Sequence, residues 1–305
     1  MKKVLIIGST TVDVVIDLDK LPTTKGSVNA KGQTSNLGGC AYNVSDTVRN
    51  FEVPSILFSP IGGGMFGEFA RAELERKGIQ SRAPAGDGDH GCCYCYVEDN
   101  GERSFIAYHG VEYYIYEKWL DRLNIDEIHS IYICGIEIEE KTGGEIVSFL
   151  EKHPDIPLFY APGPRHMYID QKLVERIMAL HPIVHLNDNE VVETTGETDI
   201  EKAARMIYDR SGNTVIVTLG PDGSAYYDGE KFEIVPPVKA EKITDTIGAG
   251  DSHIGAVMSC LYMGMSVRDS LAAANRVASA VIGEKGSHLP KEKFDRIIKL
   301  KDLKK

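Results

Sequence analysis

Short apolar runs of strand length alternate along most of the chain with stretches whose apolar residues recur at helical spacing. These amphipathic stretches end at Gly78, Gly196 and Gly212, and glycine is the residue expected just past the end of a helix. Within the strand-length runs the apolar residues are continuous rather than alternating, which is typical of strands buried on both faces. The predicted strands are residues 4–7, 56–58, 131–134, 158–160, 183–186 and 214–219.

This pattern predicts an α/β fold in which helices flank a central, mostly parallel sheet. Two excursions interrupt it. Residues 12–37 are strand-like, and residues 91–110 have the pattern of a β-hairpin that turns at Asp99-Asn100-Gly101. We expect the two to form a small β element that stands off the main sheet. Because no linker, repeat or low-complexity tract divides the chain, residues 1–305 are predicted to form a single domain.

Composition and charge narrow the classes of function. The chain has 45 acidic and 34 basic side chains and a formal charge of -11, which argues against a broad surface for nucleic acid or anionic membrane. No apolar run approaches the roughly 18 residues of a membrane span. Cys92, Cys93 and Cys95 crowd into one strand-like run, for which buried reduced thiols are a simpler interpretation than a metal site. We therefore expect a cytoplasmic protein.

Gly62, Gly64 and Gly67 spell G-x-G-x-x-G, with Asp87 20 residues after the last glycine. These are the ingredients of a dinucleotide-binding fingerprint. In an NAD-dependent dehydrogenase, however, the fingerprint belongs to the first turn between strand and helix, and residues 7–11 lack it. The match alone does not indicate an NAD enzyme.

The most specific stretch is TDTIGAGDSHIGA, residues 244–256. Gly248, Ala249 and Gly250 lead into a predicted helix, and three amides at a helix N-terminus with little side chain above them can receive an anion. A fixed carboxylate at Asp251 would repel that anion unless it takes a proton during reaction. For an isolated G-x-G-D the alternative is a tight turn followed by an acid in the first helical turn.

The segment DTIGAGD-x-x-x-GA resembles the C-terminal signature of the ribokinase-like (pfkB) family of carbohydrate kinases. Other segments resemble the family's remaining motifs in the same order, within residues 8–290. They are Asp13 after the first strand, GGCAYN at 38–43, NDNE at 187–190 and TLGPDG at 218–223. This resemblance implies an ATP-dependent kinase of ribokinase-like fold, whose two β excursions form a lid over the acceptor.

The resemblance also implies roles for individual residues. Asp251 would deprotonate the acceptor hydroxyl, and the amides of Gly248, Ala249 and Gly250 would form an anion hole. The acceptor-binding residues would be Asp13, Gly38, Gly39 and Asn43. The ATP-binding residues would be Asn187, Glu190, Thr218, Gly220, Gly223 and Asn275.

Two cations are implied beside ATP. Glu190, together with Asn187, would hold Mg²⁺ largely through water, and Asp245 would help hold a monovalent cation such as K⁺. As an isolated N-x-x-E motif, Asn187 and Glu190 would more simply be a helix N-cap with a first-turn acid. Taken alone, Asn275 is unremarkable.

The sequence departs from the family pattern at three positions. His253 stands where phenylalanine is common, and we predict a partly buried packing histidine rather than a catalytic group. Ala161 replaces a usual aspartate. Gly64 replaces the aspartate of a G-x-D-x-F-G segment, so the G-x-G-x-x-G match is an accident of that substitution. The anion hole, the base and the N-x-x-E motif are intact.

The expected reaction is phosphorylation of a hydroxymethyl group on a ribose- or hexose-like sugar or on a nucleoside resembling pseudouridine or inosine. Lid aromatics could stack on a base, although plain packing is the commoner use of such residues. They are Tyr94, Tyr96, Phe105, Tyr108, Tyr113 and Tyr114. A non-catalytic regulator responding to sugar and nucleotide is the alternative. Lid strands with unpaired edges also suggest a homodimer formed through the lid.

Overall fold

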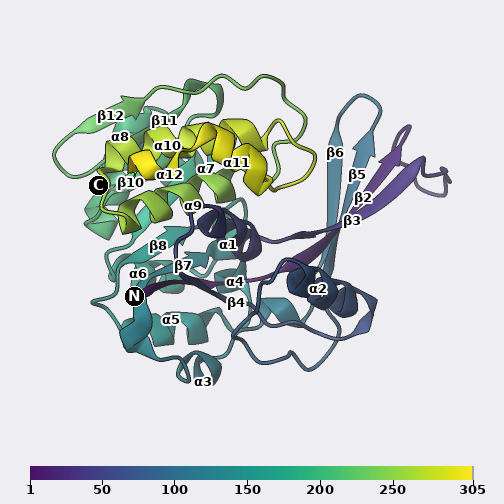
Figure 1. Cartoon of the computed structure of the whole chain (residues 1–305), viewed down its shortest axis with the longest axis horizontal. Coiled ribbons are helices and arrows are strands. Elements are labelled where there is room, and N and C mark those ends of the chain that lie inside the picture. The colour runs from purple at the N-terminus through teal and green to yellow at the C-terminus, as the bar shows by residue number, and fades with distance from the viewer. Residues whose placement is uncertain (304–305) are drawn as a thin grey trace.

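The computed structural model describes residues 1–303 and confirms the α/β class: an eight-stranded sheet runs through the molecule with helices on both faces (Figure 1). The strand order is β12 (Phe232–Val235), β11 (Ser224–Tyr227), β10 (Val215–Thr218), β9 (Ile183–Asn187), β8 (Leu158–Ala161), β7 (Ile128–Cys134), β1 (Lys3–Ile7) and β4 (Ser55–Phe58). In this order the strands from β10 to β4 pair in parallel, and β11 and β12 extend the sheet antiparallel at one edge.

All six predicted strands are present, and β1 explains their continuous hydrophobicity. Successive side chains of a strand point to opposite faces of the sheet. Val4 and Ile6 join the core formed with α1, α9 and α10, whereas Leu5 and Ile7 join the core formed with α5, α6 and α8. Each such buried aliphatic side chain contributes about 1.5–3 kcal/mol. Because both faces of β1 are buried against a hydrophobic core, its apolar residues are continuous and do not alternate with polar ones.

The helices form two layers. The layer against β1 residues Val4 and Ile6 contains α1 (Cys40–Asn50), α2 (Gly64–Arg76), α9 (Ala249–Tyr262), α10 (Val267–Val281) and α11 (Lys291–Ile297). The opposite layer contains α3 (Glu117–Leu120), α4 (Gly135–Glu139), α5 (Gly143–Glu151), α6 (Gln171–Met178), α7 (Asp188–Thr195) and α8 (Ile200–Ser211). A last short helix, α12, spans Leu300–Leu303.

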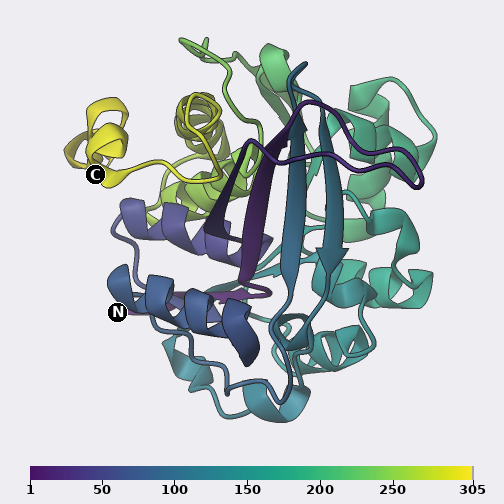
Figure 2. The same cartoon turned by 90° about the vertical axis from the view of Figure 1, so that its right-hand side faces the viewer.

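A second, four-stranded sheet projects from one side of the molecule (Figures 1 and 2). Its order is β3 (Gly32–Gly38), β2 (Thr11–Leu18), β5 (Cys92–Glu98) and β6 (Arg103–Tyr108). Strands β2 and β5 pair in parallel, and β5 and β6 form the predicted hairpin with Gly101 in its turn at φ 88°. We refer to this sheet as the lid; β3 and β6 are its unpaired edges.

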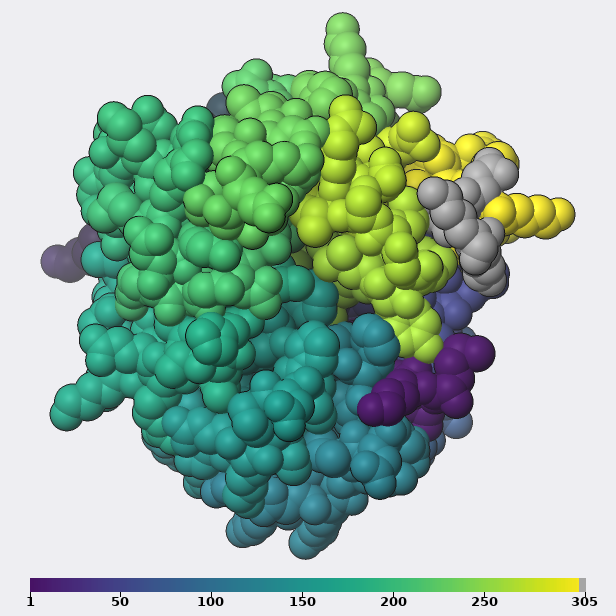
Figure 3. All heavy atoms as spheres, turned by 90° about the vertical axis from the view of Figure 1, so that its left-hand side faces the viewer, coloured from purple at the N-terminus to yellow at the C-terminus, as the bar shows by residue number. Residues whose placement is uncertain are grey.

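On the face turned away from the lid, the N-terminal residues lie beside the yellow-green C-terminal part of the chain (Figure 3). The N-terminal residues lie beside the end of α9, where the Tyr262 hydroxyl donates to the Lys2 carbonyl at 2.8 Å. Among residues 1–303, no helix is long and apolar enough to cross a membrane.

Candidate active site

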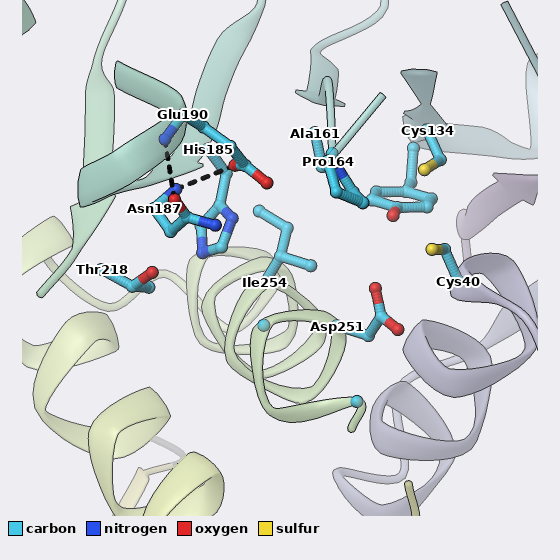
Figure 4. A pocket seen from close by; sticks show the side chains of 14 residues that line it. Cys40, Cys134, Ala161, Pro164, His185, Asn187, Glu190, Thr218, Asp251 and Ile254 are labelled. Carbon is cyan, nitrogen blue, oxygen red and sulfur yellow. Dashed lines mark hydrogen bonds between the residues drawn. The ribbon is translucent and has the colours of Figure 1, made fainter. Parts of the chain in front are cut away.

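A cavity of about 210 Å³ opens where four parallel strands of the main sheet end (Figure 4). Cys134, Ala161, Asn187 and Thr218 are the last residues of β7, β8, β9 and β10, and each lines the cavity. The carboxyl ends of parallel strands are where open α/β sheets bind ligands. Helices α1, α7 and α9 supply the remaining walls with Cys40, Glu190, Gly250, Asp251 and Ile254.

The N-terminus of α9 faces this cavity. Gly248 precedes the helix in the left-handed conformation, at φ 73°, and a Cβ there would lie 2.5 Å from Cβ of Ser287. A Cβ on Gly250 would meet nothing within 4 Å. Gly248 is therefore required by the fold, whereas Gly250 leaves open space above the first turn. The amides of Gly248 and Gly250 lie at the start of this 14-residue helix, where an anion is stabilised, while the Ala249 amide donates to the Thr246 carbonyl at 3.3 Å.

Asp251 points into the cavity from the first turn of α9 (Figure 4). Its Oδ2 accepts a 2.8 Å hydrogen bond from Nδ2 of Asn43, whose Oδ1 in turn accepts from the Ser287 hydroxyl at 2.8 Å. Burial raises the pKa of Asp251 to about 6, against the opposing effect of the Asn43 hydrogen bond. The carboxylate is thus held in one orientation with a pKa close to neutral.

Asp13, Gly38 and Gly39 lie together beside the start of α1. A Cβ on Gly38 would lie 2.1 Å from Oδ2 of Asp13, and one on Gly39 would lie 2.6 Å from the Ser9 carbonyl oxygen. The two glycines therefore let the chain pass directly over the turn that follows β1. Burial raises the pKa of Asp13 to about 6, and the nearby carboxylates of Asp251 and Asp245 raise it further.

Asn187 and Glu190 cap α7 reciprocally at the other end of the cavity. Asn187 Oδ1 accepts from the Glu190 amide at 2.8 Å, and Glu190 Oε2 accepts from the Asn187 amide at 2.9 Å. The motif is therefore a true capping box, as the simpler interpretation predicted. Glu190 nevertheless lines the cavity, where burial raises its pKa, and only one of its oxygens is used by the cap.

The residues present fit Mg²⁺ bound mainly through water. Among the described residues, no cluster of three or more histidine, cysteine or acidic side chains could hold a metal. Mg²⁺ retains several waters and needs only one or two carboxylates beside substrate phosphates. The free oxygen of Glu190 satisfies that requirement.

The ATP-binding residues predicted after β9 differ in whether they face open space or pack against the protein. Thr218 lines the cavity, and Gly220, at φ 56°, has open space where a side chain would be. Gly223 instead packs tightly, because a Cβ there would lie 2.3 Å from the Val235 carbonyl oxygen. Gly223 therefore serves the turn from β10 to β11 and does not line the cavity.

Asn275 also lies behind the cavity, in a network with His185 and His253. Asn275 Nδ2 donates to the carbonyls of Val235 and Pro236, so its Oδ1 accepts from His253 Nε2 at 3.2 Å. His253 Nδ1 must then accept from His185 Nε2, at 3.0 Å. Burial lowers the pKa of His253 to about 4, so the ring is neutral.

This histidine network corrects the prediction for His253. The ring is 2% exposed rather than partly buried, and both of its nitrogens are hydrogen-bonded, which a phenylalanine could not reproduce. It does not line the cavity, whereas His185 does.

Stacking on a base was one possible use of the lid aromatics, and the three tyrosines of the lid strands lie on the face opposite Asp13. Strand register places Asp13, Cys93 and Ala107 on one face of the lid, with Phe105 two residues along β6. Tyr94 alternates to the opposite face and packs edge-on against Phe66 of α2, 6.5 Å between ring centroids. Tyr96 and Tyr108 share that opposite face by strand alternation. Phe105 is the strand aromatic on the Asp13 face.

The G-x-G-x-x-G segment starts α2 beneath the lid. A Cβ on Gly67 would lie 2.0 Å from the Gly62 carbonyl oxygen, so the first turn of α2 requires a glycine. A Cβ on Gly64 would lie 3.2 Å from Oδ1 of Asp89. The Asp89 carboxylate therefore lies beside the position at which the family usually carries an aspartate.

Several residues at the site carry no motif and were not predicted. Glu137 of α4 is buried, its Oε1 accepts from the amide and hydroxyl of Ser9, and its Oε2 has no protein partner. His185 precedes Asn187 by two on β9 and shares its strand face, a signal that alternation could have supplied. Ser287 reaches Asn43 across 244 residues of sequence, which no local pattern can reveal.

Comparisons with known proteins identify the family of this chain. Residues 1–293 match the model of the pfkB family of carbohydrate kinases. The chain belongs to that family. It is 31% identical to an uncharacterized sugar kinase of Escherichia coli (strain K12), YegV, over 93% of this chain and 90% of that protein.

Solved structures share the fold of this kinase. A ribokinase from Thermotoga maritima superposes with a TM-score of 0.84 at 20% identity, over 98% of this chain and 100% of that one. A ribokinase from Arabidopsis thaliana complexed with ribose and ATP superposes with a TM-score of 0.81 at 19% identity, over 97% and 99% of the two chains. The protein is thus an ATP-dependent kinase of ribokinase-like fold, as the sequence resemblance predicted.

Proposed function

We propose that the protein transfers the γ-phosphoryl group of ATP to a hydroxymethyl group of a sugar, with Asp251 as the general base. The observation that carries this proposal is the Asp251 carboxylate at the start of α9, held by Asn43 at 2.8 Å beside the open space above Gly250. A hydroxyl placed next to Asp251 loses its proton as it attacks phosphorus. The α9 amides stabilise the charge on the transferring oxygens.

The nucleotide would extend from α9 toward the ends of β9 and β10. Thr218 and the open backbone at Gly220 support this direction, because both lie where the main sheet ends. Glu190 would organise Mg²⁺ through water, and Mg²⁺ would neutralise phosphate charge when bound. Gly223 and Asn275 would not contact the nucleotide. They would act behind the cavity wall, by fixing the backbone that binds the nucleotide.

The acceptor would lie between α1 and the lid face that carries Asp13. Asp13, Asn43 and the unpaired Oε2 of Glu137 are groups that hydrogen-bond hydroxyls. Closure of the lid would exclude water and limit wasteful ATP hydrolysis. These polar groups, together with the 31% identical sugar kinase of E. coli, support a sugar acceptor.

A nucleoside is the second candidate acceptor, and Phe105 is the observation in its favour. Phe105 lies on the Asp13 face of the lid and is 53% exposed, so a base could stack on it. Tyr94, Tyr96 and Tyr108 lie on the opposite face of the lid and give the nucleoside no further support. A purely regulatory protein would have no use for a base oriented as Asp251 is.

The proposal also covers the cellular compartment and the oligomeric state. Six cysteines are free, as expected in a reducing cytoplasm. A second copy of the chain could pair with the exposed edges β3 and β6 of the lid, because unpaired strand edges readily accept another strand. Light scattering of the purified protein would show whether it is a dimer.

The test is a screen of free pentoses, hexoses and nucleosides in which ADP release and a phosphorylated product are both measured. We expect Mg²⁺-dependent phosphorylation of a sugar, abolished in Asp251→Asn. Phosphorylation of nucleosides alone would replace the sugar by the second candidate. Binding of ATP and sugar without any product would contradict the proposal.

A further inference from the structure

One lid side chain reaches the segment that leads into α9. Arg103, the first residue of β6, donates through Nη1 to Oδ1 of Asp245 at 2.6 Å, and Asp245 is 6% exposed. The same Oδ1 accepts from the amide of Ile247 at 3.0 Å, and Oδ2 accepts from the amide of Gly286 at 3.2 Å. Asp245 therefore ties the lid to two loops, one entering Gly248 and the other leading to Ser287.

These contacts do not fit the monovalent cation that the family resemblance implies for Asp245. Both carboxylate oxygens already accept hydrogen bonds, and one of their donors is a guanidinium. A cation on the same carboxylate would lie against the positive charge of Arg103, and like charges at contact distance repel strongly in a site with little water.

The surroundings of Asp245 need a positive charge. Asp13 lies close enough to Asp245 and Asp251 for both to act on its carboxylate. Across the part of the chain that the structure describes, Arg103 is the only cationic side chain in an ion pair with any of these three. Strand register also places Arg103 on the lid face that carries Asp13.

We propose that the guanidinium of Arg103 takes over the role of a monovalent cation at Asp245, so that the lid itself orders the loop leading into the anion hole. Arg103 is a positioning residue in this scheme, since it touches Asp245 and no reacting atom. The bond forms only while the lid lies over the cleft. Arrival of the acceptor, which the lid covers, is thereby coupled to the phosphoryl-transfer loop.

This inference rests on the proposed anion hole at Gly248 to Gly250, but its test does not need turnover. The main variant, Arg103→Gln, keeps a hydrogen-bond donor and removes the charge. The matched control is Lys285→Ala. Lys285 pairs with Asp17 of the lid at 3.8 Å, and the two side chains are 62% and 41% exposed. The Lys285→Ala variant therefore removes a lid contact, while the side chain that it changes makes no contact with Asp245.

The first measurement is hydrogen exchange of the amides in residues 244–250. We expect exchange about tenfold faster or more in Arg103→Gln than in wild type, because the loop loses one of its restraints. Lys285→Ala should match wild type. Equal exchange in both variants would overturn the coupling of lid and loop.

The second measurement compares thermal unfolding in potassium chloride and tetramethylammonium chloride at matched ionic strength, with MgADP present. Wild type should show no K⁺-specific change. Arg103→Gln should gain a K⁺-specific rise in Tm of about 2 °C or more, because the vacated carboxylate can then bind the cation. A K⁺-specific rise in wild type, or none in Arg103→Gln, would overturn the proposed replacement. If wild type phosphorylates no acceptor at all, the proposed function fails while both of these measurements still stand.

Discussion

The acceptor side of the cleft and the histidine network share helix α9, through Asp251 and His253, and are built in opposite ways. At the acceptor side, Asp13 and Asp251 are carboxylates whose pKa is raised to about 6 by burial. In the histidine network, His185, His253 and Asn275 satisfy one another through hydrogen bonds of 3.0 and 3.2 Å. Groups kept partly unsatisfied are available for a ligand or a proton, whereas satisfied groups contribute to a unique packing. We therefore expect substitutions at the acceptor side to change activity and substitutions in the histidine network to change stability.

The sharpest test of this difference is Asp251→Asn, for which the largest effect is expected. The amide can still accept the hydrogen bond from Asn43, so the local structure is preserved. We expect kcat to fall by roughly 10³-fold or more, since the variant has no general base. Stability should not fall, because burial disfavours the charged form that the variant removes.

The measurements are ADP release with the acceptor found in the screen and thermal unfolding near neutral pH. Asp269→Asn is the matched control, since Asp269 is also an acid in the first turn of a long helix but lies on α10. Near wild-type turnover in Asp251→Asn would remove the proposed mechanism.

Glu190→Gln separates the structural cap from the proposed role in binding Mg²⁺. The amide oxygen of the substituted side chain can still accept from the Asn187 amide, so α7 should remain capped. The lost charge should raise the Mg²⁺ concentration needed for half-maximal rate by about 10–100-fold, as expected for a group that acts on a metal through water. Titration of the rate with Mg²⁺ measures this.

Glu193→Gln provides the comparison for Glu190, because it lies on the same helix with a side chain that is 59% exposed. An unchanged Mg²⁺ requirement in Glu190→Gln would leave Glu190 with the capping role alone.

His253→Phe tests the other region. The change restores the residue common in the family, but it leaves His185 Nε2 and Asn275 Oδ1 without their partner in a buried site. We expect a loss of about 2 kcal/mol in the free energy of unfolding, typical of buried polar groups left unpaired. Denaturant unfolding measures it, while turnover at a temperature where the variant is folded should stay within severalfold of wild type.

His153→Phe is the control for the histidine network, since the His153 ring packs edge-on against Phe149, a contact that a phenylalanine can also make. If His253→Phe were as stable as that control and lost turnover instead, the contrast between the two regions would be wrong.

The sequence predicted local features of this molecule well and long-range ones poorly. The strands, the lid hairpin and the glycines that start α9 all follow from periodicity or backbone conformation, which depend on neighbours in sequence. Arg103 and Ser287 contact site residues that are far away in the sequence, and no local sequence pattern predicts such contacts. His253 was predicted to be a packing residue, and its hydrogen-bond partners on β9 and α10 lie too far away in the sequence for any local pattern to indicate them.

Resemblance supplied the remaining site residues, and the structure separates them by location. Asn187, Glu190, Thr218, Gly248, Gly250 and Asp251 line one cavity. Asn275 and Gly223 lie behind its walls, where they hold backbone in place. A motif specifies which residues recur together, but it does not say which of them face the ligand.

The pH dependence of activity and of stability should distinguish the acceptor side from the histidine network without any substitution. In the proposed mechanism Asp251 and Asp13 act in their charged forms, and the pKa of each is raised to about 6. We therefore expect kcat/KM to level off above about pH 7, and well below pH 6 to fall about tenfold per pH unit if one carboxylate controls the rate, or about a hundredfold if both do. Initial rates between pH 4.5 and about 8 measure this.

Stability should respond with the opposite sign in the two regions. The raised pKa values of Asp13 and Asp251 give a contribution that is present below their ordinary pKa of 3.8 and lost as pH rises through about 6. The lowered pKa of His253 gives one that is present above 6.5 and lost as pH falls toward about 4. At pH 5 the enzyme should therefore lose activity by reversible titration of the carboxylates, while the histidine network begins to lower Tm. In His253→Phe, Tm should fall less between pH 6.5 and 4.5 than in wild type, and the rate profile should not move; a rate profile that shifts with that substitution would show that the two regions act as one.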